Sequence, residues 1–513
     1  MIPAPPRSYW MESTPSTSYP SLTQDIEVDV AVIGAGIAGL SAAWEIAATG
    51  RSVAVLEAGR IVSGVTGHTT AKLSSLHTLA YSRIARTAGA QAARLYAESQ
   101  QSAVERAAEI ADRLGIDCDL ERLPGFAYAA TPATVDQVRA EADAARAAGL
   151  DASYVTDTGL PFPVAGAVRV ERQAQVHPRK YLLGLAEDLV AKGGRIFEQT
   201  RAVGLRERSP CRVRTDRGSV VTAKDVVVAT QYPVFNRGLL FARLRTRREL
   251  VVAGAIPADH DPAGIYITPE ENTRSVRTAP YRDGRRLLIV TGEHFSPGAA
   301  DVAERWERLE AWARDRFPAA DLGYRWATQD ATASDHIPFV GPFHPGTRHV
   351  FVAAGFGGWG MSTGVMAGRL IAATIDGEDL PWAGLYDPRR LHLLREARGF
   401  FGLHAHVARH FFGDRIRSSG GGSAGDLAPG SGGVVRIGAQ QRAVHCDEDG
   451  VLHGLSARCT HLGCIVHFND VEQAWECPCH GSRFDVDGAV IQGPANRPLP
   501  SRPVEDPSGG AEL

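Results

Sequence analysis

Six cysteine and histidine residues near the end of the chain have the spacing of metal ligands. A Cys-x-His-x-x-Cys group is followed, after 12 residues, by a Cys-x-Cys-His run. The six residues are Cys459, His461, Cys464, Cys477, Cys479 and His480. Thiolates and imidazoles are the side chains that hold zinc ions and iron–sulfur clusters. The spacing therefore predicts a metal centre built from two short loops.

The two loops resemble those of Rieske proteins of the cytochrome bc type, and the resemblance covers about residues 433–503. In that family two thiolates hold one iron of a [2Fe–2S] cluster and two neutral imidazoles hold the other. The resemblance implies four ligands, namely Cys459, His461, Cys477 and His480, and a disulfide between Cys464 and Cys479. Gly493-Pro494-Ala495 is similar to the proline loop that covers the cluster. A structural zinc site is the alternative, but it leaves the two extra cysteines and this proline loop unexplained.

Ser482 and Phe484, which follow the second loop, affect the reduction potential of such a cluster. Ser482 matches the hydroxyl that donates to a cluster sulfide in the Rieske family, whereas Phe484 stands where high-potential members carry tyrosine. A missing hydrogen bond leaves negative charge on sulfur less stabilised and favours the oxidised cluster. We expect a potential below the top of the Rieske range of about −150 to +300 mV.

A second chemical signal lies near the start of the chain. The β-branched run 29–33 leads into Gly34-Ala-Gly36-Ile-Ala-Gly39, then into a helix pattern, and a second strand pattern ends at Glu57. In a dinucleotide cradle the first glycine makes the tight turn, the second admits the pyrophosphate and the third permits close helix–strand packing. The acid accepts from a ribose hydroxyl. The cradle predicts a dinucleotide cofactor but does not by itself distinguish FAD from NAD.

Residues 27–380 resemble the family of D-amino-acid oxidase, glycine oxidase and sarcosine oxidase, which implies FAD. The similar segments are VSGVTGHTTAKL after Glu57, the strand pattern DVVVAT ending at Thr230, and the late pair ASDHIPFVGPF and VFVAAGFGGWGMSTG. By this resemblance Gly357, Gly358, Gly360 and Met361 line the pyrimidine side of the flavin. The alternative is that residues 355–364 form only a loop, since glycine clusters are common in turns.

His68 lies in the first of these segments and has two interpretations. In dimethylglycine- and sarcosine-dehydrogenase relatives a histidine here bonds covalently to the flavin, but the tryptophan that precedes it there is Gly67 in this chain. The sequence therefore favours His68 as a noncovalent neighbour of the flavin.

Substrate-side signals are weaker. Relatives often anchor a substrate carboxylate through arginine, and Arg274 and Arg277 lie on an expected strand of the substrate domain, with surface ion pairs as the alternative. Tyr266 and Asp335 are further candidates for the pocket. His404, His406 and His410 raise the idea of a mononuclear iron site, but no fitting acid precedes them, and a helix face exposed to solvent or at an interface is favoured.

The expected fold is an α/β Rossmann-like FAD-binding domain with an inserted α+β substrate domain, followed by a small all-β Rieske domain. We place an N-terminal arm at 1–26, the FAD-dependent oxidoreductase part at 27–388, a helix and Gly/Ser linker at 389–432 and the Rieske domain at 433–507. The linker is marked by seven glycines and four serines among residues 418–433. The net charge of −3 in 513 residues gives no case for nucleic acid as partner. We expect no membrane span and a cytoplasmic protein, because the N-terminus has no apolar signal region.

A flavin accepts two electrons as a hydride and a Rieske cluster passes them singly. We therefore expect a dehydrogenase that oxidises a C–N bond of an amine or amino acid and passes electrons to a one-electron acceptor protein or quinone. Two other hypotheses remain open. In one the cluster feeds the flavin for a partner enzyme; in the other the protein is a redox sensor.

Overall fold

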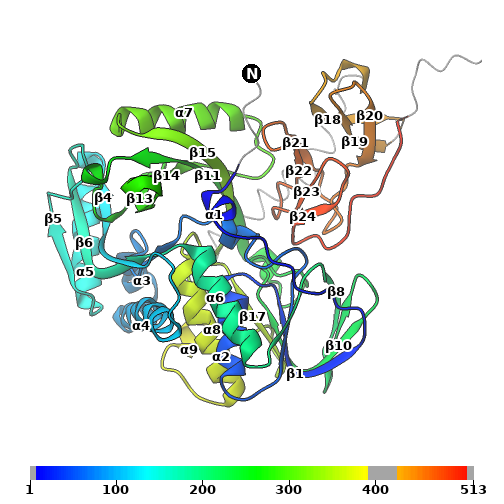
Figure 1. The fold of residues 1–513 in the computed structure, drawn as a ribbon, viewed down its shortest axis with the longest axis horizontal. Helices are drawn as coiled ribbons and strands as arrows, with labels where there is room; N and C mark the ends of the chain where they lie inside the picture. The colour runs from blue at the N-terminus through cyan, green and yellow to red at the C-terminus, as the bar shows by residue number, and fades with distance from the viewer. Residues whose placement is uncertain (1–6, 391–423, 439, 505–513) are drawn as a thin grey trace, which may run out of the picture.

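The computed structural model describes residues 7–390, 424–438 and 440–504, and these form three parts (Figure 1). Two of the parts are each built on a large sheet and are formed by residues 7–390. The third, which we call the C-terminal module, comprises residues 424–504 without residue 439 and lies beside both. The segment with His404, His406 and His410 and most of the expected linker lie outside the described residues.

The first sheet has eight strands and a parallel centre, in the order β16-β17-β10-β1-β2-β7. Only β16 runs antiparallel to its neighbour on this path, and the hairpin β8–β9 extends the sheet from β10. The bounds are β1 Ile26–Ile33, β2 Val53–Leu56, β7 Arg195–Phe197, β8 Ala202–Arg206, β9 Cys211–Thr215, β10 Val220–Val228, β16 Phe339–Pro342 and β17 Val350–Ala354.

The β-branched run 29–33 lies in a strand that is buried on both faces. In β1 the side chains of Val30 and Val32 join the core beneath the helices, while Ala31 and Ile33 join the core on the other face. Successive strand residues point to opposite faces, so a continuous apolar run suits a strand covered on both sides. The helices of this part and its neighbourhood are α1 Tyr9–Glu12, α2 Ile37–Ala47, α3 Ala80–Ala88, α4 Ala90–Leu114, α6 Pro178–Ala191, α8 Gly360–Asp376 and α9 Ala383–Tyr386.

The second sheet has nine strands in the order β15-β11-β14-β13-β12-β4-β6-β3, with β5 paired to β6. The bounds are β3 Lys72–Leu73, β4 Glu121–Ala129, β5 Ala152–Val155, β6 Gly166–Gln175, β11 Leu244–Ile256, β12 Ile265–Ile267, β13 Ser275–Pro280, β14 Arg286–Phe295 and β15 Asp321–Ala333. Its helices are α5 Val135–Ala147 and α7 Val302–Arg316. This mixed sheet, drawn from segments on both sides of β10 in the sequence, is the expected inserted α+β part.

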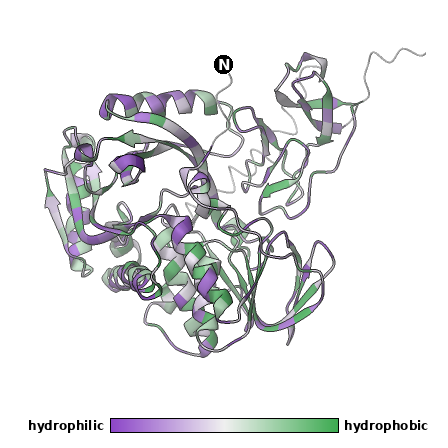
Figure 2. Cartoon of the chain, viewed as in Figure 1, coloured by the Kyte–Doolittle hydropathy of each residue, from purple (hydrophilic) through white to green (hydrophobic). Residues whose placement is uncertain are grey.

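Helix α7 shows how the sequence positions this second layer. Its buried residues are Val302, Trp306, Leu309 and Ala313, which recur at helical spacing, and the rest of the helix is mostly hydrophilic (Figure 2). Asp301 is the N-cap residue of the helix and is followed three residues later by Glu304, but its side chain makes no capping hydrogen bond. Its carboxylate pairs with Arg305 instead, at 2.8 Å.

The C-terminal module contains two small antiparallel sheets, as expected for an all-β domain. One has the order β18-β19-β20 and the other β21-β22-β23-β24. The bounds are β18 Gly432–Ile437, β19 Gln440–Cys446, β20 Leu452–Ser456, β21 His467–Asn469, β22 Ala474–Glu476, β23 Arg483–Phe484 and β24 Val490–Gln492. Short 3-10 turns among the described residues are Val65–His68, Pro132–Thr134, Leu240–Ala242, Ala258–His260, Arg282–Gly284 and Ala424–Asp426.

The N-terminal arm is more than a polar extension. Trp10 is fully buried and its indole N–H donates to the carbonyl of Thr69 at 2.7 Å. The hydroxyl of Ser8 donates to the carbonyl of Gly67 at 2.7 Å. The arm therefore braces the segment that contains His68.

The uncharged stretch 350–368 is divided between β17 and α8. Among the described residues, none of the helices is both long and apolar enough to cross a bilayer.

Candidate active site and metal centre

A cavity of about 1380 Å³ lies where the three parts of the chain meet. It exceeds the roughly 300–1,000 Å³ of typical small-molecule pockets, so it has room for a large cofactor together with a substrate. Nine of the residues predicted from the sequence line it, namely Gly34, Gly36, Glu57, His68, Thr230, Gly357, Gly358, Gly360 and Met361. Gly39 lies behind this wall.

The three cradle glycines have separate structural reasons. Gly34 has a φ of +99°, and a Cβ there would lie 2.6 Å from the carbonyl oxygen of Ala229. A Cβ on Gly39 would lie only 1.8 Å from the carbonyl oxygen of Gly34, so α2 packs against the turn without room for a side chain. Gly36 is the N-cap of α2 and lines the cavity. The N-terminal end of α2 therefore faces a space suited to a diphosphate.

Glu57 ends the second strand pattern as predicted and is held by two backbone donors. Its carboxylate accepts from the N–H of Ala35 and the N–H of Gly59, both at 2.9 Å. Burial raises the pKa of this carboxyl, because the charged form loses water. A carboxylate has further lone pairs, so Glu57 can still accept from a ribose hydroxyl in the cavity.

The glycine-rich turn before α8 is tied to the second sheet by Asp330, a residue that the sequence analysis missed. Gly357 and Gly358 have positive φ values of 63° and 91°, and the N–H of Gly358 donates to the Asp330 carboxylate. Burial raises the pKa of Asp330 to about 6. Asp330 therefore fixes the turn, and it also lines the cavity.

His68 lines the cavity and its ring is oriented by the backbone. Nδ1 lies 2.9 Å from the carbonyl oxygen of Gly64. Because a carbonyl can only accept, Nδ1 carries the proton in the neutral ring and Nε2 keeps a lone pair. Burial lowers the pKa of His68, which favours that neutral form. The carbonyl of His68 itself accepts from the Trp326 indole at 2.8 Å.

Lys72 is a second missed residue on the cavity wall. Its ammonium donates to the hydroxyls of Thr70 and Ser275, both at 2.7 Å, and it has no carboxylate partner among these contacts. Burial lowers the pKa of Lys72 to about 8. A charged residue inside the buried run TAKLSS was the available signal, since an unpaired lysine is rarely buried without a role.

The structure does not bring the substrate-side candidates to the cavity. The guanidinium of Arg277 donates to backbone carbonyls, including that of Ala71 at 2.7 Å. Arg274 pairs with Glu293 at 2.5 Å. The Tyr266 hydroxyl donates to the carbonyl of Pro262 at 2.6 Å, and Asp335 pairs with Arg390 at 2.7 Å. None of these four residues lines the cavity, and their polar atoms are bonded within the protein, so a role for them in binding substrate stays a prediction.

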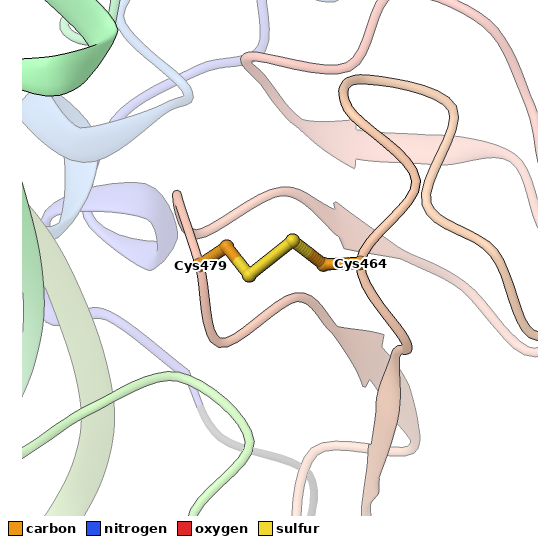
Figure 3. The surroundings of a disulfide bond; sticks show 2 residues. All are labelled: Cys464 and Cys479. Carbon is orange, nitrogen blue, oxygen red and sulfur yellow. A yellow bond between two sulfur atoms is a disulfide. The ribbon is translucent and has the colours of Figure 1, made fainter. Parts of the chain in front are cut away.

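The predicted metal loops come together in the C-terminal module. The predicted disulfide between Cys464 and Cys479 is present and joins the two loops (Figure 3). Cys459 and Cys477 are buried free thiols, and the rings of His461 and His480 lie nearly perpendicular to each other with centroids 4.9 Å apart. Each loop closes with the same bond, from Gly463 N–H to Cys459 and from Gly481 N–H to Cys477, both at 2.9 Å.

This donor set fits a [2Fe–2S] cluster. The buried Nδ1 of His461 has no hydrogen-bond partner among the described residues, although a buried polar atom normally has one. A metal ligand role would satisfy that nitrogen. The hydroxyl of Ser482 accepts from the N–H of Ala495 at 3.0 Å, so the proline loop is bonded to the second cluster loop.

Phe484 gives a test of how these surroundings set the potential. It is fully buried in the core of the C-terminal module. Phe484→Tyr is expected to raise the potential of the cluster by about 20–60 mV, the equivalent of one hydrogen bond for a one-electron couple. Potentiometry followed by EPR measures this directly, with Phe468→Tyr as control; equal potentials in wild type and Phe484→Tyr would contradict the account.

The C-terminal module docks on the second sheet through a buried ion-pair network. The guanidinium of Arg248 on β11 pairs with Glu472 at 2.8 Å and with Glu476, and its side chain is 1% exposed. Arg483 pairs with the same two carboxylates, at 2.6 Å and 3.2 Å. Part of the module also forms a wall of the cavity, namely Glu472, Arg483, Val490, Ile491, Gln492, Gly493 and Asn496.

Solved structures share the fold of the first two parts. Glycine oxidase from Geobacillus kaustophilus matches with a TM-score of 0.59 and 21% identity, over 71% of this chain and 99% of that one. L-proline dehydrogenase from P. horikoshii matches with a TM-score of 0.59 and 17% identity, over 72% of this chain and 98% of that one.

Relatives in sequence extend over both halves. The Bacillus subtilis protein YhfW, named as a Rieske 2Fe-2S iron–sulfur protein, is 32% identical over 96% of this chain and 97% of its own length. The gamma-glutamylputrescine oxidoreductase of Escherichia coli is 29% identical over 41% of this chain and 50% of its own.

Family models divide the chain as the geometry does. The model of the FAD dependent oxidoreductases, DAO, matches residues 29–374, and the model of the Rieske [2Fe-2S] domain matches residues 422–503. The first match spans the cradle, the cavity turn and both large sheets, and the second spans both metal loops. The chain belongs to the DAO family of FAD-dependent oxidoreductases, and its C-terminal module is a Rieske domain with a [2Fe–2S] cluster.

Proposed function

We propose that this protein is an FAD-dependent dehydrogenase that oxidises a C–N bond of an amine or amino acid and passes the electrons through its Rieske cluster to an outside acceptor. One observation carries the proposal: the second cluster loop is docked on the strands that wall the cavity. The hydroxyl of Thr246 on β11 donates to the carbonyl of His480 at 3.1 Å, and the amide of Gln329 on β15 donates to the carbonyl of Gly481 at 2.9 Å.

We propose the following residues as those that hold the two cofactors. We assign the diphosphate of FAD to the N-terminus of α2 behind Gly34 and Gly36, with Gly39 allowing the close packing. Glu57 accepts from the ribose, and the turn 357–361 lines the flavin, with Thr230 and His68 as noncovalent neighbours. Cys459, His461, Cys477 and His480 hold the cluster.

When bound, FAD would accept a hydride from the carbon next to the substrate nitrogen. That chemistry requires a neutral amine, and Lys72 is one group on the cavity wall that can take its proton. Burial lowers the pKa of Lys72 to about 8, so its Nζ is partly neutral at mildly alkaline pH. The imine product is hydrolysed to a carbonyl compound and the free amine or ammonia.

The similarity to amine and amino-acid enzymes supports this substrate class. Glycine oxidase, L-proline dehydrogenase and the L-amino acid deaminase from Proteus vulgaris share the fold, and the Escherichia coli relative is named for gamma-glutamylputrescine. The cluster releases electrons one at a time, so we propose a one-electron acceptor protein or a quinone as partner. We also propose that the protein acts in the cytoplasm.

Anaerobic titration with a panel of amines and amino acids tests the proposal. Optical spectra follow the flavin and EPR follows the cluster in the same samples. Bleaching of the flavin followed by the signal of the reduced cluster is the expected result. Reduction by NAD(P)H alone would favour electron flow from cluster to flavin for a partner enzyme, and no reduction by any compound would favour a redox sensor.

A further inference from the structure

One segment of the FAD domain connects the cavity to the metal loops. Residues 230–241, which we call the bridging segment, follow β10 and precede β11. Thr230, Gln231 and Val234 line the cavity at its start. The hydroxyl of Tyr232 donates to the carbonyl of Phe241 at 3.1 Å, so the segment is closed on itself. Tyr232 is 1% exposed, which places its ring inside the contact between the domains.

The bridging segment meets both imidazoles of the cluster site. The ring centroid of Tyr232 lies 6.4 Å from that of His461 and 6.0 Å from that of His480. The ring centroid of Phe241 lies 6.2 Å from that of His480. Only Gln231 separates Thr230 on the cavity wall from Tyr232 at the imidazoles.

Asn236 adds a directed contact at the rim of this interface. Its Oδ1 lies 2.8 Å from Nε2 of His461. Because the buried Nδ1 of His461 is the atom left for iron, Nε2 carries the proton and donates to the Asn236 oxygen. An acceptor at this position increases electron density on the imidazole and so stabilises the ferric state of the cluster.

We infer that the bridging segment is an internal electron port, through which electrons pass between the flavin cavity and the imidazole side of the cluster, with Tyr232 and Asn236 as its positioning residues. The inference rests on the proposed function only in that both cofactors carry electrons. Each transfer removes one electron from the reduced flavin and converts one ferric ion of the cluster to ferrous. While the domains are docked, this side of the cluster is occupied by the FAD domain, so an outside carrier has to meet the cluster on another side.

Photoreduction tests the port without any substrate. A light pulse with a sacrificial donor reduces the flavin, and absorbance then follows reduction of the cluster. In Tyr232→Leu the transfer is expected to slow about tenfold, because two aromatic contacts that hold the docked geometry are lost. Tyr232→Phe keeps the ring and is expected to transfer at the wild-type rate. Leu239→Ala, at a residue 66% exposed in the same segment, is the matched control.

Asn236 gives a second readout that a purely structural residue would not give. Asn236→Leu removes the acceptor and is expected to raise the potential of the cluster, whereas Asn236→Asp strengthens the acceptor and is expected to lower it. Flavin and iron contents confirm that each variant is loaded. Unchanged transfer in Tyr232→Leu together with equal potentials in both Asn236 variants would overturn the port.

The outcomes separate the port from the proposed function. In one outcome light-reduced flavin passes electrons to the cluster, with the variants responding as stated, while no amine reduces the flavin. That result would support the electron port and reject the proposed substrate class. If amines reduce both the flavin and the cluster at rates that no variant of the bridging segment changes, the proposed function is supported and the electron port is rejected.

Discussion

Gly39→Ala is expected to yield a protein without bound FAD. The new Cβ would lie 1.8 Å from the carbonyl oxygen of Gly34, and this oxygen belongs to backbone that cannot rotate away. Helix α2 would have to move from the turn, which displaces the N–H groups that face the cavity. Overpacking of this kind costs about 1–3 kcal/mol or more, and here the strain falls on the cofactor cradle itself. Flavin absorbance per chain and the melting temperature measure the effect.

Substitutions at two further glycines show how the loss of FAD should depend on the space around the new Cβ. Among protein atoms a Cβ on Gly36 would meet only the hydroxyl of Thr66, at 3.0 Å, so Gly36→Ala leaves α2 in place, and we expect it to weaken FAD binding less, by crowding the pyrophosphate alone. Gly384 in α9 has open space around its Cβ position, and Gly384→Ala is the matched helical control. The iron content should stay constant in all three, because the Rieske domain has its own core. Full flavin content in Gly39→Ala would show that the cradle does not bind FAD.

Arg248→Met is expected to release the Rieske domain from the rest of the protein. Arg248 is buried between the carboxylates of Glu472 and Glu476, and only Arg483 would remain to balance them. Removing one member of a buried ion-pair network costs about 3–5 kcal/mol, because a charge is left without compensation. The release also opens the cavity wall formed by the Rieske domain. Small-angle scattering detects the change in shape, and light-driven flavin-to-cluster transfer should be largely lost.

A surface ion pair is the control for this variant. Arg122 pairs with Glu105 at 2.5 Å, and both side chains are 38% exposed. Exposed pairs contribute about 0–1 kcal/mol, so Arg122→Met should leave scattering and transfer unchanged. Wild-type scattering and wild-type transfer in Arg248→Met would rule out this network as the basis of docking.

The same network predicts how docking depends on pH. Burial alone would raise the pKa of Glu472, but the charges of Arg248 and Arg483 outweigh it and lower this pKa to about 2. A carboxyl whose pKa is lower in the docked state stabilises that state above its free pKa of about 4.3. Docking should therefore be constant from about pH 5 to 8 and weaken as the pH falls from about 4 toward 2.

The sequence was sufficient for features in which neighbouring residues do the chemistry. The strand, glycine turn, helix and terminal Glu57 all lie within 29 consecutive residues, 29–57, and the structure has them in that arrangement. The disulfide between Cys464 and Cys479 followed from a resemblance carried by short, closely spaced loops. Such patterns are visible in a sequence because local spacing determines their geometry.

Contacts between the domains could not be predicted from the sequence, because the residues that form them are far apart along the chain. Asn236 and His461 are 225 residues apart, and Arg248 and Glu472 are 224 apart. Nothing in the local pattern around either residue indicates its partner. The same limit applies to the substrate side: Arg277 lies on the expected strand, but the sequence does not show that its side chain donates to backbone carbonyls of distant segments.

The wall that the Rieske domain contributes to the cavity has a consequence for biosynthesis. Residues 472–496 are translated more than 100 residues after the last glycine of the flavin turn, Gly360. Domains generally fold as units from the N-terminal side during synthesis. During synthesis the cavity of the FAD domain therefore lacks the wall that the Rieske domain later forms. FAD can enter the cavity from that side. We therefore expect flavin to bind most readily before the Rieske domain docks on the second sheet and completes the cavity wall.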